Sequence, residues 1–171
     1  MSRPINSKGI DLVKQFEGLR TTAYTCPAGI WTIGYGHTGG VSKGQTVTAV
    51  EAEDLLQNDL AKAGDQVQQM VRVSLHDNQY AALCSFVFNA GAASLKASTL
   101  LKRLNGGDYD GVPSELAKWV KATDPKTGAK ITLAGLVRRR SAEGQLWLEG
   151  GDPAAFSASA DMPQEVHADG A

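Results

Sequence analysis

Three residues with complementary chemistry lie close together near the N-terminus: Glu17, Cys26 and Thr32. Eight residues separate the carboxyl from the thiol, and five separate the thiol from the hydroxyl. Cleavage of a glycosidic bond needs a protonated acid for the leaving oxygen and a second group that supplies or directs the nucleophile. An acid, a thiol and a hydroxyl that converge on one bond meet this need. The spacing therefore makes glycoside hydrolysis the first hypothesis.

The acid must be held where a carboxyl keeps its proton. Ile10, Val13 and Glu17 fall at i, i+3 and i+7, which places Glu17 on the apolar face of a helix. We expect Ser7 to cap the start of this helix and Gly18 to end it. Burial and the partial negative charge of a helix C-terminus both favour the protonated form of a carboxyl. That form is the one a general acid requires.

The thiol and the hydroxyl flank a predicted turn. Residues 23–26 and 30–35 read as short strands around Pro27, Ala28 and Gly29, so we expect a small antiparallel sheet. A thiol with an ordinary pKa of ~8.5 is mostly neutral at pH 7 unless its surroundings lower that pKa. At this point Cys26 is a candidate base, a candidate nucleophile or a neighbour of the attacking water.

Helical patterns cover most of the remaining chain. We expect helices over residues 48–71, 77–90, 98–104, 114–121 and 133–147. Thr48 and Glu51 form a capping box at the start of the long helix, and Gly64 is expected to kink it or end its first part. The helix over residues 77–90 is the most hydrophobic and is expected to form the centre of the core. Leu133 and Val137 are expected on the apolar stripe of the last helix.

Composition limits the class of protein. The chain has 171 residues, of which 42% are hydrophobic and 20% charged, as in an ordinary globular domain. We expect one catalytic domain of two lobes over residues 1–150 and a disordered acidic tail over residues 151–171. The net charge is −1, whereas nucleic-acid-binding proteins usually carry a dense basic stripe, so we expect no nucleic-acid partner. We expect neither a metal nor a cofactor.

The two cysteines and the N-terminus suggest where the protein is made. Cys26 and Cys84 do not form a disulfide framework, and Cys84 is expected to be a buried small hydrophobe. No secretory or transmembrane pattern opens the chain, because the first apolar run is interrupted by charged and polar residues. We therefore expect synthesis in the cytoplasm and no stable membrane insertion.

Three motifs in order along the chain resemble one known family. Glu-x8-Cys-x5-Thr is followed by Gly-Tyr-Gly-His at residues 34–37, Phe-Val-Phe-Asn-Ala-Gly at 86–91 and Gly-Leu-Val-Arg-Arg-Arg at 135–140. Over residues 7–149 the chain resembles the phage-type lysozymes (endolysins) that are similar to the phage T4 enzyme. The resemblance implies an α+β, lysozyme-like fold, in which the active-site cleft lies between a small antiparallel sheet lobe and a mainly helical lobe.

The resemblance also implies an activity and roles for particular residues. The activity is hydrolysis of the β-1,4 bond between N-acetylmuramic acid and N-acetylglucosamine in bacterial peptidoglycan, with Glu17 as proton donor. Cys26 would be the second catalytic residue, where the best-known member has Asp, and Thr32 would position the water. The implied substrate contacts are Phe88, Asn89, Ser98 and Tyr35. His37 would support the site by hydrogen bonding, and Arg139 or Arg140 would pair with the acid.

The implied biology is lysis of a host cell. The partner is the peptidoglycan glycan strand, and a holin is expected to release a monomeric enzyme from the host cytoplasm to the periplasm and cell wall. One alternative is a cell-wall amidase or peptidase that uses Cys26 with His37 or His76. Another is an accessory membrane-disrupting activity of the basic last helix.

Overall fold

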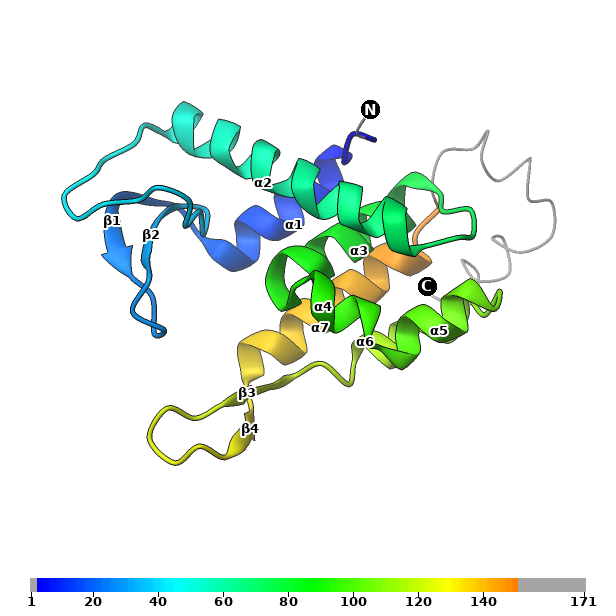
Figure 1. Cartoon of the computed structure of the whole chain (residues 1–171). Helices are drawn as coiled ribbons and strands as arrows, with labels where there is room; N and C mark the ends of the chain where they lie inside the picture. The colour runs from blue at the N-terminus through cyan, green and yellow to red at the C-terminus, as the bar shows by residue number, and fades with distance from the viewer. Residues whose placement is uncertain (1–2, 151–171) are drawn as a thin grey trace.

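The computed structural model describes residues 3–150 of the chain, and the expected tail over residues 151–171 lies outside the described residues. The elements in chain order are α1 (Ser7–Glu17), β1 (Arg20–Thr25), β2 (Trp31–Gly34), α2 (Ala49–Met70), α3 (Asp77–Ala90), α4 (Ala92–Lys96), α5 (Thr99–Asn105), α6 (Val112–Leu116), β3 (Lys121–Thr123), β4 (Lys130–Thr132) and α7 (Ala134–Leu148). The sheet of β1 and β2 lies near one end of α2, and α3–α7 gather at the other end (Figure 1). The expected α+β class is confirmed.

Helix α1 ends at the candidate acid. Asn6, rather than the expected Ser7, caps its start, because the Asn6 side chain accepts a hydrogen bond from the backbone N–H of Gly9. At the other end Gly18 adopts a positive φ of 71°, and its N–H donates to the carbonyl of Lys14. Glu17 is therefore the last residue of α1, as the sequence predicts.

The predicted small sheet forms directly after α1. β1 and β2 pair antiparallel, with Tyr24 opposite Thr32 and Thr25 opposite Trp31, and an irregularity in β1 lies between Arg20 and Tyr24. The chain reverses at residues 26–30, where the backbone N–H of Cys26 donates to the carbonyl of Ile30 at 3.0 Å. Cys26 thus immediately follows β1, and the second residue of β2 is Thr32.

Helix α2 begins at the predicted capping box, in which Thr48 and Glu51 exchange both hydrogen bonds. It runs without a break past Gly64, so the predicted kink is wrong. A Cβ at this position would lie 2.1 Å from the hydroxyl of Tyr80. Gly64 therefore allows close packing of α2 on α3, at a helix-propensity cost of about 0.5–1 kcal/mol.

Helix α3 forms the centre of the core, as predicted. It packs against α1, α2 and α7, and all its residues from Asn78 to Val87 are buried. A capping box of His76 and Gln79, which the sequence analysis missed, begins the helix. A second, smaller apolar cluster of Val13, Leu56 and Leu60 joins α1 to α2 beside the β1–β2 sheet.

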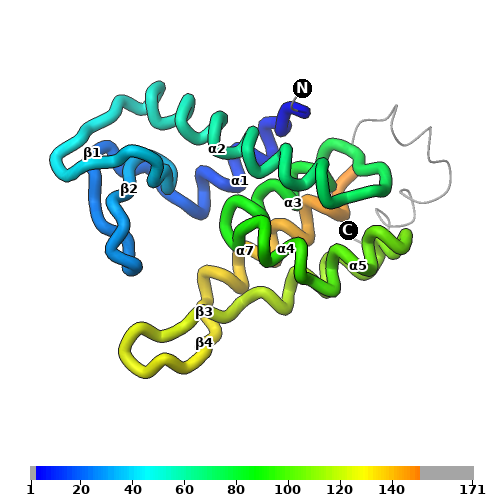
Figure 2. Tube along the Cα trace, viewed as in Figure 1, coloured from blue at the N-terminus to red at the C-terminus, as the bar shows by residue number. Residues whose placement is uncertain are grey.

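The C-terminal part departs most from the predictions. The short helix α4 was not predicted. Helix α6 ends at Leu116 instead of continuing to residue 121, because the chain turns there and continues into an unpredicted hairpin of β3 and β4. This hairpin projects away from the helices (Figures 1 and 2). Leu133 and Val137, which were expected on the buried stripe of the last helix, are exposed.

Candidate active site

The carboxyl of Glu17 is paired with a buried guanidinium. Nη1 of Arg139, on α7, donates a hydrogen bond of 2.6 Å to Oε2 of Glu17. The Glu17 side chain keeps 21% of its surface exposed, whereas Arg139 keeps 4%. Glu17 is therefore both reachable from solvent and held in place. This geometry decides between the two candidate arginines: Arg139, not Arg140, pairs with the acid.

A glycine turn after β2 approaches the same carboxyl. Gly36 adopts a positive φ of 81°, and a Cβ at this position would lie 2.9 Å from Oε1 of Glu17. An L-residue would therefore meet both backbone strain and a steric clash. The Gly-Tyr-Gly-His motif thus has a physical reason, which is to let the backbone reach the acid.

Cys26 and Thr32 lie together on the β1–β2 hairpin. The Thr32 hydroxyl donates to the carbonyl of Ile30 at 3.0 Å and is buried. Hydrogen bonds to the backbone of Ile30, and then of Ala28, lower the pKa of the Cys26 thiol, and the Thr32 hydroxyl acts in the same direction. The thiol is partly exposed and free. The fold therefore increases its thiolate fraction at neutral pH.

A buried ionic cluster centred on Glu143 includes Arg139, the residue that pairs with Glu17. The Glu143 carboxylate is fully buried and lies 2.7 Å from Nε of Arg140 and 3.4 Å from Nε of Arg139, and it accepts a hydrogen bond of 2.6 Å from Ser85. Burial raises the pKa of Glu143 and lowers that of Arg140, and their mutual attraction opposes both shifts. Arg140 in turn donates to Oδ1 of Asn89 at 2.8 Å. The cluster therefore links the candidate acid to a candidate substrate residue.

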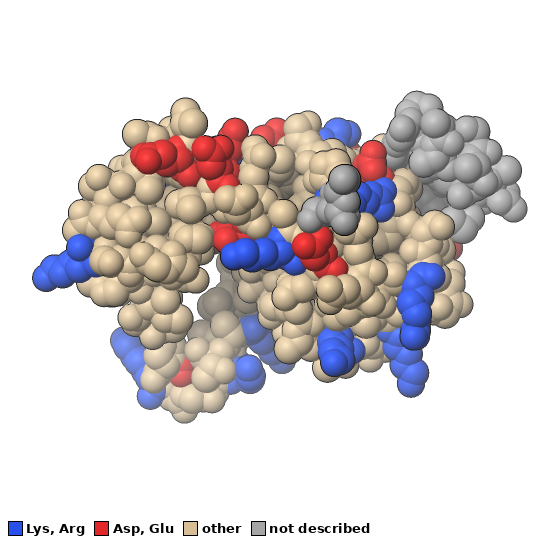
Figure 3. All heavy atoms as spheres, turned by 45° about the horizontal axis from the view of Figure 1, so that its top comes forward, with Lys and Arg blue, Asp and Glu red and all other residues tan. Residues whose placement is uncertain are grey.

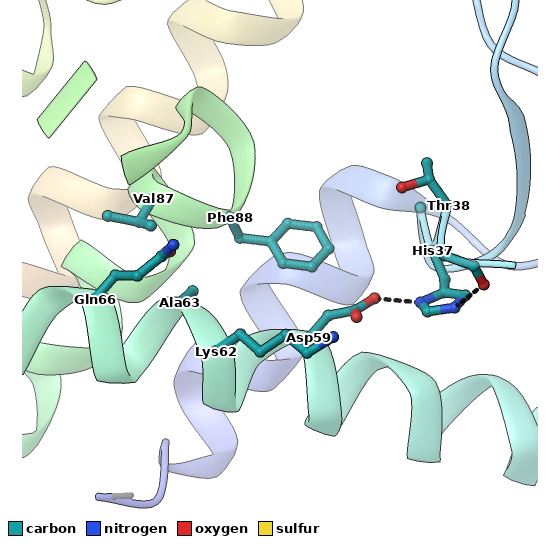
Figure 4. A pocket seen from close by; sticks show the side chains of 10 residues that line it. His37, Thr38, Asp59, Lys62, Ala63, Gln66, Val87 and Phe88 are labelled. Atoms are coloured by element: carbon teal, nitrogen blue, oxygen red, sulfur yellow. Dashed lines mark hydrogen bonds and ion pairs between the residues drawn. The ribbon is translucent and has the colours of Figure 1, made fainter. Parts of the chain in front are cut away.

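A cavity of about 350 Å³ lies beside the glycine turn, between α2, α3 and residues 36–39. His37 and Asp59 point toward one another across its rim, with Nδ1 and Oδ2 2.7 Å apart, while Nε2 donates to the carbonyl of Gly39 at 2.9 Å (Figure 4). Phe88 also lines the cavity (Figure 4). Gly36 lines the cavity as well, and the same glycine lies next to the carboxyl of Glu17.

Other predicted residues do not line this cavity. Tyr35 packs against the apolar cluster between α1 and α2, and Lys14 lies over its ring. The Ser98 hydroxyl caps α5, accepting from the N–H of Leu101 and donating to the carbonyl of Leu95. Asn89 is exposed at the end of α3 and holds Arg140. Within residues 3–150 no group of three or more His, Cys, Asp or Glu side chains could hold a metal ion.

Sequence reasoning missed Glu143 and the centre of the ionic cluster. The available signal was spacing, because Glu143 lies four residues after Arg139 and three after Arg140 on a predicted helix. Ser85, in the most apolar helix, was also missed as a donor to this acid. Neither residue lies in one of the motifs that the sequence analysis identified.

Known proteins resemble this chain over most of its length. Residues 14–143 match the phage lysozyme family. This chain belongs to that family. An endolysin of Acyrthosiphon pisum secondary endosymbiont phage 1 is 46% identical to this phage lysozyme over 143 residues, or 84% of this chain and 97% of that protein. The endolysin of Salmonella phage P22 is 42% identical over 123 residues, or 69% of this chain and 84% of that protein.

A solved structure extends the likeness to three dimensions. The muramidase domain of SpmX from Asticaccaulis excentricus matches this phage lysozyme with a TM-score of 0.80 at 39% identity, covering 85% of this chain and 98% of that chain. The predicted lysozyme-like fold is confirmed, and the protein is a glycoside hydrolase of the lysozyme type.

The alternative functions receive no support. For the amidase hypothesis, His76 caps α3 and His37 is engaged by Asp59, so both candidate bases have other partners. For the membrane hypothesis, Arg139 and Arg140 are buried in the ionic cluster and do not form a basic surface on α7. No helix within residues 3–150 is long and apolar enough to cross a membrane.

Proposed function

We propose that this phage lysozyme cleaves the β-1,4 bond between N-acetylmuramic acid and N-acetylglucosamine in bacterial peptidoglycan, with Glu17 as the general acid. The observation that carries the proposal is the position of the Glu17 carboxyl, which Arg139 holds at the end of a helix, next to Gly36 in the turn that lines a cavity. The acid protonates the glycosidic oxygen as the bond to the sugar C1 breaks, so the leaving group departs as a neutral hydroxyl.

Cys26 and Thr32 assist the water that attacks C1. The lowered pKa of the Cys26 thiol favours the thiolate, which can accept a proton from this water, and the neighbouring Thr32 hydroxyl orients it. In this assignment Arg139 and His37 do not react. They fix the carboxyl of Glu17 and the turn of residues 36–39.

The glycan strand would occupy the cavity beside the turn of residues 36–39, where Phe88 supplies an apolar ring face. Asn89, which lies outside this cavity at the end of α3, would contact the strand through its exposed amide, whose carbonyl oxygen is fixed by Arg140. Ser98 and Tyr35 stay predictions as substrate contacts. We further propose a monomeric enzyme that waits in the host cytoplasm until a holin opens the way to the cell wall.

The decisive variant is Glu17→Gln, which removes the proton and keeps the shape. We expect release of reducing ends from peptidoglycan to fall about 10²–10⁴-fold, the usual contribution of a general acid. Mass spectrometry of the wild-type digest should show N-acetylmuramic acid at the new reducing ends. The matched control is Glu51→Gln, an exposed acid in the capping box of α2.

Two outcomes would contradict the proposal, provided that the variant folds. Circular dichroism must first show that Glu17→Gln is folded. Normal turnover by the folded variant would remove Glu17 from the mechanism. New amino groups without new reducing ends would replace the proposed glycosidase with an amidase or a peptidase.

A further inference from the structure

The segment 121–138, which we call the hairpin surface, contains β3, β4 and the first residues of α7. Its four cations are Lys121, Lys126, Lys130 and Arg138. All four are exposed, and none forms an ion pair with another residue in the part of the chain that the structure describes. The single acid, Asp124, accepts hydrogen bonds within its own turn. The hairpin surface therefore presents uncompensated positive charge, although the whole chain has a net charge of −1.

The same segment exposes apolar side chains. Ile131, Leu133 and Val137 are 40%, 39% and 45% exposed, and they make up half of the large hydrophobic residues that are exposed within residues 3–150. A two-stranded ribbon buries little surface of its own and is marginal in isolation. Successive members of this apolar set are two and four positions apart, a spacing that places side chains on one face of a strand or of a helix. A contiguous exposed apolar face is typical of an interaction site. The charge and the apolar groups thus indicate a binding surface.

The hairpin surface borders the catalytic region. β4 continues directly into α7, and Arg139, the partner of Glu17, lies six positions after Leu133. At the helical rise per residue, this distance is about 9 Å along α7. In Figure 3 the projecting hairpin, with its blue side chains, lies below the β1–β2 end of the molecule, and a hollow opens between these two parts and the helices. A polymer that reaches Glu17 through this hollow would also pass the hairpin.

We propose that the hairpin surface binds the stem peptides of peptidoglycan through their carboxylates. This inference rests on the proposed function and specifies which part of the substrate is recognised outside the cavity. The glycan backbone consists of neutral hydroxyl and acetamido groups, whereas the stem peptides carry free carboxylates and alanine methyl groups. Lysine ammonium groups complement the carboxylates, and the exposed aliphatic residues complement the methyl groups.

The test compares two substrates and two triple variants. The hairpin variant is Lys121→Gln/Lys126→Gln/Lys130→Gln. Its control is Lys43→Gln/Arg72→Gln/Lys102→Gln, which removes three exposed cations that also lack an ion pair with a described residue. The substrates are intact peptidoglycan and glycan strands freed of stem peptides by an amidase. The lactyl carboxylates that the amidase newly exposes are then converted to neutral amides with a carbodiimide and ammonia. Reducing ends are measured on both substrates at 0.05 M and 1 M salt.

On intact peptidoglycan at low salt, we expect the hairpin variant to lose about tenfold in kcat/KM, mainly through KM, since each exposed charge contact contributes modestly. On peptide-free strands it should match the wild type. The control should match the wild type on both substrates, and at 1 M salt the difference between the variants should disappear. Thermal unfolding should be unchanged in both variants.

Several results would overturn this proposal. They include an equal loss on both substrates, an equal loss in the control, or a loss that salt does not reduce. Binding of the wild type, but not of the hairpin variant, to phosphatidylglycerol vesicles with unchanged kinetics would assign the surface to lipid instead. Cleavage of peptide-free strands by the wild type tests the proposed function separately, because that reaction does not involve the stem peptides.

Discussion

Three consecutive arginines at the start of α7 have opposite environments. Arg138 is exposed and has no ion-pair partner among residues 3–150, whereas Arg139 and Arg140 are buried and share the carboxylate of Glu143. A buried charge needs a fixed counter-charge, and this need also fixes its geometry. An exposed charge keeps its mobility and acts at longer range, where salt screens it. Of the two buried arginines, Arg139 holds the carboxyl of Glu17 and Arg140 holds Asn89, whereas Arg138 belongs to the surface proposed to bind substrate.

The two cysteines repeat this contrast. Cys26 is partly exposed in the turn between β1 and β2. Hydrogen bonds, of which the one to the backbone of Ile30 has the largest effect, lower its pKa. Burial raises the pKa of Cys84 to about 12. We therefore expect the same thiol group to react at one position and to stay inert at the other. Burial disfavours the charged form of both Arg140 and Cys84, but the carboxylate of Glu143 opposes this effect for the arginine, whereas the thiol remains neutral.

The largest expected effect is the difference in thiol reactivity. The labelling rate of Cys26 by iodoacetamide should rise with a midpoint below pH ~8.5, because a lowered pKa yields thiolate at lower pH. Cys84 should react at least 10³-fold more slowly at pH 8 (order-of-magnitude estimate), where a thiol with a pKa of about 12 is almost entirely protonated and is also buried. Peptide mapping of the labelled protein measures both rates.

Labelling also tests the assignment of Cys26 in the reaction. The adduct should inactivate the enzyme, and a Cys84→Ala variant should be inactivated at the wild-type rate. Normal turnover by protein that is fully labelled at Cys26 would exclude the thiol from the mechanism. Rapid labelling of Cys84 in the folded enzyme would contradict the contrast between the two sites.

The next largest effect concerns stability. Glu143→Ala leaves two buried guanidinium groups without their carboxylate, so we expect a loss of about 3–5 kcal/mol in the free energy of unfolding. Arg138→Ala, on the same helix, should change that free energy by less than about 0.5 kcal/mol. Urea unfolding followed by circular dichroism measures both. A loss below about 1 kcal/mol for Glu143→Ala would mean that the cluster is not a stabilising counter-charge arrangement.

Arg139→Lys keeps the charge and removes the guanidinium geometry. Arg139 donates through Nη1 to Glu17 and lies beside Glu143 through Nε, and a single ammonium cannot reproduce both contacts. We expect kcat to fall about 10–100-fold, corresponding to the loss of one charge-assisted hydrogen bond. The matched change Arg138→Lys should leave kcat unchanged. Equal effects of the two substitutions would show that position 139 contributes only charge.

These contrasts also define what the sequence could predict. Local signals succeeded, since the capping box of Thr48 and Glu51 and the glycine after Glu17 mark helix ends through contacts between near neighbours. Tertiary contacts were not readable. The run of three arginines does not reveal which are buried, because that depends on where Glu143 and Ser85 meet them across α3 and α7.

The remaining misses have two origins. The strands β3 and β4 have three residues each, which is too short for a period of two to identify a strand. Gly64 is predicted to break the helix because the sequence does not show that the side chain of Tyr80 occupies the space beside it. In the candidate site, spacing and resemblance were enough to propose Glu17, Cys26 and Thr32. The choice of Arg139 as the partner of Glu17 depends on how α7 packs against α1, which the sequence does not show.

The smallest expected effect is that of an exposed ion pair. Nζ of Lys8 lies 2.7 Å from Oε2 of Glu149, a distance similar to those in the buried cluster, but the two side chains are 60% and 49% exposed. Because water solvates both groups in the folded and unfolded states, Lys8→Gln should cost no more than about 0.5 kcal/mol, and 1 M salt should remove this difference. Urea unfolding at two salt concentrations measures it. Similar losses for Lys8→Gln and Glu143→Ala would mean that the distance between charges, rather than burial, determines how much each ionic contact stabilises this fold.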